Sequence, residues 1–274
     1  MNKFKIYFPI IIFGYNRPNH LKNLIKNIKK YKNLKNHKIY YFNDGPRTTE
    51  DALKINKIKK ILTKSKIKFK KKIFRSKNIG LSESIINGVN QILKKNLAAI
   101  IIEDDLILSK NAIIFINHYL NIFKNSNQIG SISAYSYIDH IPNVNVKNNY
   151  FTKRHSSWCW GTWSKVWSQI NWNKIKYKNL YNSKKFEEKL NDSGYDLKYF
   201  LWANDKKIIN SWAVKFNAYC VLKNLTSIQP SKSLIINKGF DGSGSHTFMP
   251  NLRKLFYENS SKLENFKLNN FDII

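Results

Sequence analysis

Three adjacent carboxylates close an apolar run near the middle of the sequence. Residues 98–108 read Ala-Ala-Ile-Ile-Ile-Glu-Asp-Asp-Leu-Ile-Leu, so Glu103, Asp104 and Asp105 follow five apolar residues. A short run of Ile and Ala is typical of a buried strand, and three acids at its end are costly to bury unless a cation neutralises them. Oxygen ligands suit Mg²⁺ or Mn²⁺, and such a metal bound to a phosphate would supply the cation. A strand end that simply meets solvent is the alternative.

The segments around this run alternate between strand and helix patterns. The expected strands cover 6–13, 39–42, 66–74 and 98–102, and the expected helices cover 19–32, 50–63, 83–95 and 110–124. This rhythm over the first 125 residues predicts an α/β fold in which a mostly parallel sheet carries helices on both faces. In such sheets, ligands bind beyond the carboxyl ends of the strands.

Three polar segments fall at these expected carboxyl ends. They are Gly14–Pro18, Asn43–Arg47 and Glu103–Asp105. Their convergence on one edge favours a ligand site over a solvent-exposed strand end. No Gly-x-Gly-x-x-Gly follows the first strand and no Gly-Lys-Ser/Thr occurs, which argues against dinucleotide cofactors and P-loop chemistry. We expect instead a nucleotide held by an acid on its base and by a metal on its diphosphate.

The composition indicates a folded protein with a complete core. The chain has 274 residues, of which 42% are apolar and 14% aromatic, enough for one large domain or two small ones. No apolar run reaches the ~18–20 residues that cross a bilayer. Residues 6–13 contain Pro9 and lack a small-residue cleavage site, so we expect a buried strand there and not a leader. Cys159 and Cys220 lack metal-type spacing, and two isolated thiols favour the cytoplasm.

The net charge of +31 comes from 48 basic and 17 acidic residues, and only five of the basic residues are Arg. Abundant Lys, Asn and Ile would follow from an AT-rich genome, which is one explanation. Adhesion to an anionic surface is the other, because each Lys near an anionic membrane contributes roughly 1 kcal/mol. Reading DNA bases favours Arg. The charge therefore ranks an anionic inner-membrane surface above nucleic acid, and we expect no specific nucleic-acid partner.

The second half of the chain has a different character. Residues 129–134 and 150–152 read as strands, 196–222 read as mostly helical, and 239–246 form a glycine-rich loop. Trp158, Trp160 and Trp163 cluster in one short segment. Such a cluster is more often core, but an indole also stacks on the C–H face of a sugar. These three are the candidate acceptor-binding residues.

In their order along the chain, these segments resemble GT-A glycosyltransferases, and most closely the N-acetylglucosaminyltransferase I family and its bacterial relatives. The matching residues are Pro9–Ile12, Arg17, Asp44-Gly45, Ala98–Leu106 with Glu-Asp-Asp, Ser131–Ala134, the aromatic run into Trp163 and Trp167, and Gly244–His246. The resemblance implies one GT-A domain with a nucleotide-sugar half (1–125) and an acceptor half (126–250). A basic tail (251–274) follows.

The resemblance also implies roles for the donor-site residues. Arg17 and Asp44 would hold the uridine end of a UDP-sugar, because the uracil N–H needs an acceptor. Glu103 and Asp104 would belong to the donor site, with Asp104 beside the ribose and metal. Asp105 would bind the Mn²⁺ or Mg²⁺ that offsets charge on the leaving UDP. Finally, His246 would lie in a loop that closes over the diphosphate.

The catalytic base is where the sequence departs from the family. The family places an acid just before a Trp in a late helix, whereas here Ser211 precedes Trp212. Inverting transfer needs a carboxylate to take the proton of the acceptor hydroxyl. We expect Asp205 to be this base, with Asp241 as the second candidate. Asp192 and Asp196 are expected on a solvated helix face.

The resulting hypothesis is a metal-dependent inverting glycosyltransferase. It would move GlcNAc or a similar sugar from a UDP-sugar to a hydroxyl of a bacterial surface glycan, a lipooligosaccharide or a lipid-linked acceptor. We expect a cytoplasmic enzyme, in part bound to the inner membrane. Two alternatives stay open: a sugar-phosphate nucleotidyltransferase, and a basic non-catalytic module that binds nucleic acid or membrane. The latter would leave Glu103–Asp105 without a role.

Overall fold

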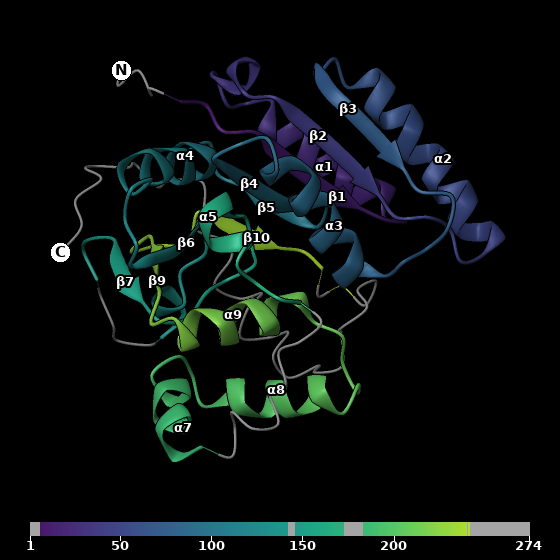
Figure 1. Cartoon of the computed structure of the whole chain (residues 1–274). Helices are drawn as coiled ribbons and strands as arrows, with labels where there is room; N and C mark the ends of the chain where they lie inside the picture. Colours follow the sequence, from purple (N-terminus) through teal and green to yellow (C-terminus); the bar gives the residue numbers. More distant parts are fainter. Residues whose placement is uncertain (1–5, 142–145, 173–182, 240, 242–274) are drawn as a thin grey trace.

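The structure is a computed structural model that describes residues 6–141, 146–172, 183–239 and 241 (Figure 1). Its centre is one eight-stranded sheet. Its strands are β1 (Ile10–Gly14), β2 (Ile39–Asn43), β3 (Phe69–Phe74), β4 (Ala98–Glu103), β6 (Ile129–Ser133), β7 (Tyr150–Thr152), β8 (Trp160–Trp163) and β9 (Thr226–Gln229). Two short strands, β5 (Leu106–Leu108) and β10 (Ile235–Asn237), pair antiparallel beside it.

The strand order is β3-β2-β1-β4-β8-β6-β9-β7. Strands β3, β2, β1 and β4 are parallel neighbours, and β8 and β7 run against the other six. The helices are α1 (Pro18–Ile28), α2 (Thr49–Lys64), α3 (Leu81–Leu93), α4 (Ala112–Ile122), α5 (Ser164–Trp167), α7 (Lys184–Asn191), α8 (Asp196–Asp205) and α9 (Trp212–Leu222). The expected α/β fold with a mostly parallel sheet is confirmed.

Helices cover both faces of the sheet. Successive residues of a strand point to opposite faces, and β8 shows what each face meets. The indole of Trp160 stacks on Trp212 of α9, with 4.9 Å between ring centroids. A Cβ on the next residue, Gly161, would press against Ile116 and Leu120 of α4. Helix α4 therefore packs on one face of the sheet and α9 on the other.

The helices of the second half form a further layer. In Figure 1, α7 and α8 lie below α9, on the side away from the sheet. A small apolar cluster joins the three helices. Its buried members are Phe186, Leu190, Leu197, Leu201, Ala218 and Val221. Among the described residues, no helix combines the length and apolar character needed to cross a bilayer.

Two local predictions need correction, and one segment without a predicted structure receives one. The first strand begins at Ile10 and not at residue 6, because the N–H of Phe8 bonds the side chain of Asn117 on α4 instead of a neighbouring strand. Helix α3 begins at Leu81 and not at residue 83: Gly80 precedes it at a positive φ of 84°, and Ser82 is buried in its first turn. The aromatic run that contains Trp160 is strand β8, in the interior of the sheet.

Candidate active site

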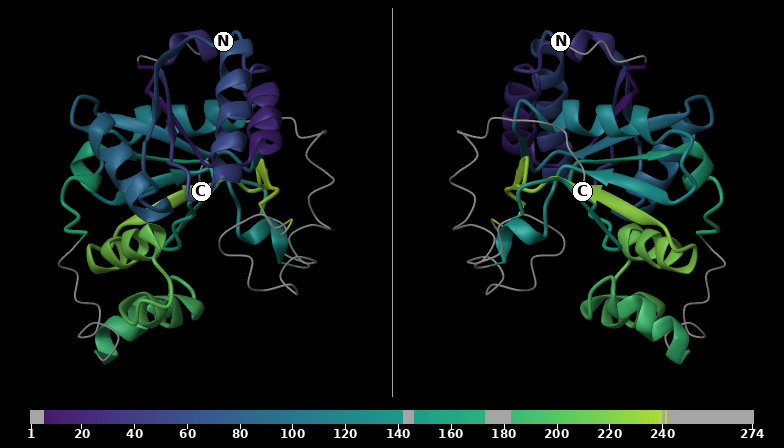
Figure 2. Two further views of the ribbon diagram at one scale, coloured as in Figure 1. Left: turned by 90° about the vertical axis from the view of Figure 1, so that its right-hand side faces the viewer. Right: turned by 90° about the vertical axis from the view of Figure 1, so that its left-hand side faces the viewer.

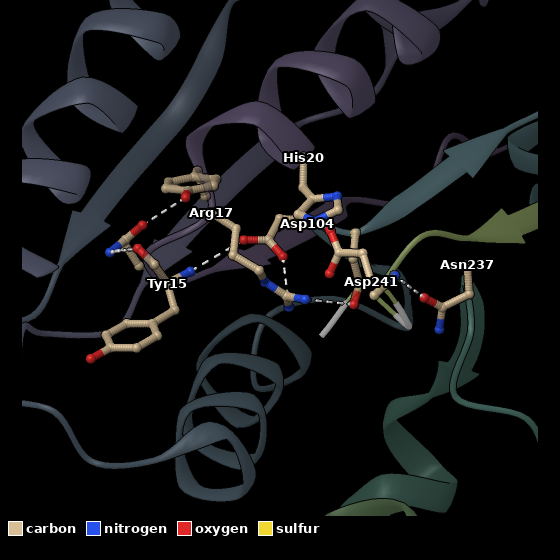
Figure 3. A network of polar contacts seen from close by, with 10 residues as sticks. Tyr15, Arg17, His20, Asp104, Asn237 and Asp241 are labelled. Carbon is tan, nitrogen blue, oxygen red and sulfur yellow. Dashed lines mark hydrogen bonds and ion pairs between the residues drawn. The ribbon is translucent and has the colours of Figure 1, made fainter. Parts of the chain in front are cut away.

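The acids after β4 enclose an arginine. Arg17, at the start of α1, places Nη2 3.0 Å from Asp104 Oδ1 and Nη1 3.0 Å from Asp105 Oδ2 (Figure 3). The side chain of Asp104 is 1% exposed, that of Asp105 13% and that of Arg17 19%. Because β1 and β4 are parallel neighbours, their carboxyl ends bring residues 88 positions apart together. A buried carboxylate pair with a bound cation therefore lies at the strand ends, where the sequence predicted a ligand site.

Burial controls the ionisation of this cluster. Burial raises the pKa of Glu103 to about 8, with a further contribution from Asp105, while Arg17 opposes the change. Burial also raises the pKa of Asp104 to about 6, and Arg17 again opposes it. For Arg17 itself, burial works against the charged form, but the neighbouring acids prevail and its pKa is raised. At neutral pH, Asp104 is therefore mostly ionised beside Arg17, whereas burial favours the protonated form of Glu103 even with Arg17 present.

The segment between β1 and α1 is held by Asp51. Its carboxylate accepts hydrogen bonds from the Tyr15 hydroxyl at 2.6 Å and from the Asn16 amide at 2.7 Å. It also caps α2, since Thr48 and Asp51 form a reciprocal capping box. These hydrogen bonds lower the pKa of Asp51, although burial works in the opposite direction. Asp51 therefore fixes the backbone that carries Arg17.

Asp44 lies at the end of β2, and its carboxylate is largely committed to backbone amides. It accepts hydrogen bonds from the N–H groups of Gly45 at 2.9 Å, Ile79 at 3.0 Å and Gly80 at 2.9 Å. These bonds close the turn before α3. A carboxylate has about four acceptor positions, so one remains for a ligand. The predicted role on uracil stays a prediction.

A hollow opens beside these residues. Its volume is about 590 Å³, counting the part that is open to solvent. Arg17, Asp44, Glu103 and Asp104 line it, and so do residues of the two neighbouring turns. Two of those, Arg47 and Asn78, are hydrogen bonded to each other at 3.0 Å. Both cations and acids face the hollow, which fits a ligand with an anionic part and hydrogen-bonding groups.

The segment after β10 returns to the same corner. The N–H of Lys238 donates to the carbonyl of Asp105 at 2.9 Å. Asp241 Oδ2 lies 2.9 Å from His20 Nε2 of α1. A Cβ at Gly239 would overlap the Asp105 carboxylate, so any other residue there would displace that carboxylate. The structure thus places Asp241, a candidate base, beside the acids at the end of β4 (Figure 3).

The donor set fits a hard divalent cation. Among the described residues, no three His, Cys, Asp or Glu side chains are arranged to hold a metal. Mg²⁺ and Mn²⁺ sites of the donor-binding kind need fewer, because one or two carboxylates combine with substrate phosphates. Asp104 and Asp105 already hold a cationic group between them, and the missing Cβ of Gly239 leaves room over Asp105. The residues present therefore fit such an ion.

The predicted aromatic acceptor site needs correction. Trp160 and Trp163 are 1% and 0% exposed, and Trp163 donates its indole N–H to the carbonyl of Leu120. Neither offers a ring face to a sugar, so the prediction for these two is wrong and they are core residues. Trp158 is half-buried and packs edge-on against Tyr135, with centroids 4.5 Å apart. Its predicted role is not tested.

The remaining site predictions have different outcomes. Asp205 ends α8, in the layer outside α9, and its predicted role as the base stays a prediction. Ser211 caps α9, since its hydroxyl accepts from the N–H of Val214. Asp192 and Asp196 form ion pairs with Lys153 and Arg154 and are more than half exposed, as expected of a solvated face. His246 lies outside the described residues.

The sequence patterns did not identify three residues of the site: Asp51, His20 and Asn237. Asp51 had a readable signal, the capping pattern Thr48-x-x-Asp51. His20 and Asn237 had none, because they belong to the site only through the return of residues 237–239 and Asp241 to this corner. Asn237 Oδ1 accepts from the N–H of Gly239 at 2.7 Å and so shapes the passage over Asp105.

No protein-family model and no curated protein matches the chain. Solved structures show a distant likeness to the chain, among them the following three. One is the mannosyltransferase PcManGT from Pyrobaculum calidifontis in complex with GDP-Man and Mn²⁺ (11% identity, 62% of this chain, 50% of that chain, TM-score 0.40). Another is S. aureus TarS 1–349 (11% identity, 86% of this chain, 61% of that chain, TM-score 0.48).

The third is GalNAc-T7 with UDP, GalNAc and Mn²⁺ (9% identity, 85% of this chain, 44% of that chain, TM-score 0.47). The chain thus spans between 44% and 61% of the length of these proteins. At such identities and TM-scores, the likeness concerns the arrangement of the chain and carries neither a family nor an activity over to it.

Proposed function

We propose that the protein is a metal-dependent glycosyltransferase that takes its sugar from a UDP-sugar. The observation that carries the proposal is the cation-binding pair Asp104–Asp105 at the carboxyl end of β4, beside a hollow lined by both acids and cations. A diphosphate brings negative charge to acids only through a bridging metal. The sequence resemblance to the N-acetylglucosaminyltransferase I family supports the same activity.

The residues that line the hollow, together with Asp105 next to Asp104, would each bind a different part of the donor. Asp105 is the proposed metal ligand, since it is the more accessible of the pair, and the buried Asp104 faces the ribose side. When bound, Mn²⁺ or Mg²⁺ would offset the charge of the departing UDP. Arg17 and Arg47 are within the hollow and supply cationic donors for phosphate oxygens. Asp44 keeps one acceptor position for the uracil N–H.

The proposed reaction is a single displacement with inversion. The bond from the anomeric carbon to the diphosphate oxygen breaks while the acceptor oxygen bonds to that carbon, and the hydroxyl proton passes to a carboxylate. Asp205 and Asp241 are the two candidate bases. The location of Asp241 beside the acid corner favours it, because Asp205 lies in the outer helical layer. His20 would then orient that carboxylate until the acceptor arrives.

The finer identity of the substrates is part of the proposal. GlcNAc or a similar sugar is the proposed donor group, and the acceptor is a hydroxyl of a surface glycan, a lipooligosaccharide or a lipid-linked saccharide. His246 is proposed to close over the diphosphate, and Trp158 to contact the acceptor. These assignments rest on the sequence resemblance.

The test is a screen of nucleotide sugars for metal-dependent hydrolysis and for protection against heat. UDP with Mn²⁺ should raise the unfolding temperature of the wild type, and Asp105→Asn should remove both this shift and turnover. Asp192→Asn is the matched control, since it removes an exposed acid of an ion pair far from the hollow. Loss in both variants, or in neither, contradicts the proposal. Release of pyrophosphate from UTP and a sugar phosphate would establish the nucleotidyltransferase alternative instead.

A further inference from the structure

One edge of the molecule carries an uninterrupted positive charge. Residues 52–77 cover most of α2, all of β3 and the turn after it, and they contain 12 Lys and Arg but no Asp or Glu. The two elements touch, since Lys59 Nζ of α2 lies 5.3 Å from the ring centroid of Phe74 on β3. They lie together at one side of the sheet in Figure 1, and Figure 2 shows α2 beside α1 at this edge. We call this surface the α2–β3 face.

The charge of the chain is not evenly distributed. Residues 6–95 carry 23 Lys and Arg against four Asp and Glu, whereas the described residues of 96–241 carry 16 against ten. Drift in base composition would add lysine to both parts alike. Among the described residues of the α2–β3 face, one cation, Lys54, forms an ion pair, with Glu50. The face therefore keeps its charge unneutralised, which calls for an explanation beyond composition.

Helix α2 presents an ordered stripe to solvent. Leu53, Lys57, Lys60 and Lys64 are exposed and follow the spacing i, i+4, i+7 and i+11, which places them on one side of a helix. The opposite side is apolar and buried. Leu53 is 60% exposed at the start of this lysine row. Such a side suits contact with an anionic membrane surface, where the lysines meet headgroup charge and Leu53 can reach the apolar boundary below it.

The lysines of β3 have a simpler partial explanation. Lys70, Lys71 and Lys72 are exposed on the edge strand of the sheet, and lysine on an edge strand prevents pairing with another sheet. That explanation covers these three residues only. It does not extend to the stripe on α2, which has no strand edge to protect.

The face runs into the rim of the donor hollow. The N–H of Arg75 bonds the carbonyl of Asn43 at 3.0 Å, so the charged segment continues to the carboxyl ends of the strands. Ile79 and Leu81 follow it, both more than a third exposed, and Leu81 also lines the hollow. The α2–β3 face therefore continues to the rim of the hollow.

We propose that the α2–β3 face docks on a bilayer that contains anionic lipids. Eleven of its 12 cations are lysines, which attract headgroup charge without the planar fork that base recognition uses. The exposed Leu53, Ile79 and Leu81 can enter the apolar boundary below the headgroups. The phosphate backbone of a nucleic acid has no apolar region that these side chains could enter. The proposal concerns binding and does not depend on the catalytic assignment.

The test is sedimentation of the full chain with vesicles at low salt. Vesicles with about one third phosphatidylglycerol should bind the protein, and phosphatidylcholine alone should not. The partition coefficient should fall about 100-fold in the triple variant Lys57→Gln/Lys60→Gln/Lys64→Gln. This follows because each of the three lysines contributes about a factor of five. A matched control removes three exposed lysines of α7–α9, Lys184, Lys206 and Lys223. It should change the coefficient less than about threefold, since charges beyond the Debye length are screened.

Leu53→Asn separates a bilayer from a polyanion. It should weaken vesicle binding while leaving binding to single-stranded DNA unchanged. Equal loss in the two triple variants would overturn the proposal, because attraction would then follow net charge and not this face. The proposal would also be overturned if DNA displaced the protein from vesicles and Leu53→Asn bound vesicles as the wild type does. The face would then be assigned to nucleic acid. Circular dichroism of each variant confirms that it is folded.

Discussion

Arg17→Met would remove the guanidinium that lies between Asp104 and Asp105 while keeping an apolar stem of similar length. Two carboxylates, one of them almost fully buried, would then face each other without their cation. Removing one partner of a buried ion pair costs about 3–5 kcal/mol. Because Arg17 and Asp105 are partly exposed, we expect the lower end, about 3 kcal/mol. For a chain of this size that corresponds to a fall of about 6–12 °C in unfolding temperature.

The diagnostic result is rescue by a divalent cation. If the carboxylate pair is a metal site, Mn²⁺ can replace the missing charge, and it no longer competes with Arg17. Saturating Mn²⁺ stabilises a binding protein by about 2.7 kcal/mol at 100 times its Kd. Mn²⁺ should therefore restore most of the lost stability and shift the variant more than the wild type. Differential scanning calorimetry with Mn²⁺ and with EDTA measures both effects.

The pH adds a second check on the same variant. Burial raises the pKa of Asp104 to about 6 and that of Glu103 to about 8, with Arg17 opposing both shifts. Without Arg17, these acids hold their protons to higher pH. Lowering the pH to 5 then neutralises the unpaired acids, so the stability difference between variant and wild type should shrink.

The control is Arg154→Met, which breaks the pair with Asp196 in the other half of the molecule. Asp196 is 53% exposed, so the loss should be about 1 kcal/mol and Mn²⁺ should not reverse it. The reasoning fails if Arg17→Met melts at the wild-type temperature, or if Mn²⁺ protects the variant no more than the wild type. Either result would mean that the pair is not a cation site.

Three further outcomes follow from the geometry. Gly239→Ala places a Cβ against the Asp105 carboxylate and should weaken Mn²⁺ binding about tenfold by calorimetric titration; unchanged affinity would refute the close passage. Burial lowers the pKa of His37 and His155 to about 4, below the unfolded value of about 6.5, so the unfolded chain takes protons first. For each of the two histidines, the free energy of unfolding should fall by about 1.4 kcal/mol per pH unit between pH 6.5 and 4. Urea unfolding should show this slope, and glutamine at both positions should flatten it. Trp160→Ala should cost about 3–5 kcal/mol as a core deletion, whereas a surface role predicts almost no change in the urea midpoint.

The strand-helix alternation of the first half could be predicted because its signals are local. The apolar runs at 39–42 and 98–102 coincide with β2 and β4, and Pro18 opens α1 as expected. Burial on both faces is what makes these strands nearly continuous in apolar residues. The sequence pattern and the fold therefore carry the same information in this part of the chain.

Strand β8 shows where local signals end. Its residues Trp160–Trp163 read as an aromatic cluster, and their pairing is set by β4 and β6, which come from other parts of the chain. Gly161 makes sense only once α4 is in place, because Ile116 and Leu120 occupy the space that a Cβ would need. The aromatic residue types alone do not show whether these side chains are exposed. For this reason the sequence pattern predicts an acceptor surface where Trp160 and Trp163 are core residues.

The sequence predicts where the site lies, but not which of its side chains form ion pairs with one another. That Arg17, Asp104 and Asp105 lie at one sheet edge follows from parallel topology. That the guanidinium bridges both carboxylates depends on the backbone between Gly14 and Arg17, which Asp51 holds from α2. The hydrogen bond from Lys238 to Asp105 likewise joins segments more than 130 residues apart. Periodicity carries no signal for such contacts.

Mn²⁺ and UDP should bind cooperatively, because neither site is complete alone. The described side chains include no group of three metal-ligating acids, cysteines or histidines, so the remaining ligands must come from the diphosphate and water. In turn, Asp104 and Asp105 repel a bare diphosphate, since Arg17 supplies a single positive charge between them. Mn²⁺ should therefore tighten UDP binding, and by linkage UDP should tighten Mn²⁺ binding by the same factor. Calorimetric titrations of each ligand with and without the other measure that factor. Tight Mn²⁺ binding that UDP does not alter would mean that the metal has a complete protein site elsewhere, and the acid pair after β4 would lose its proposed role.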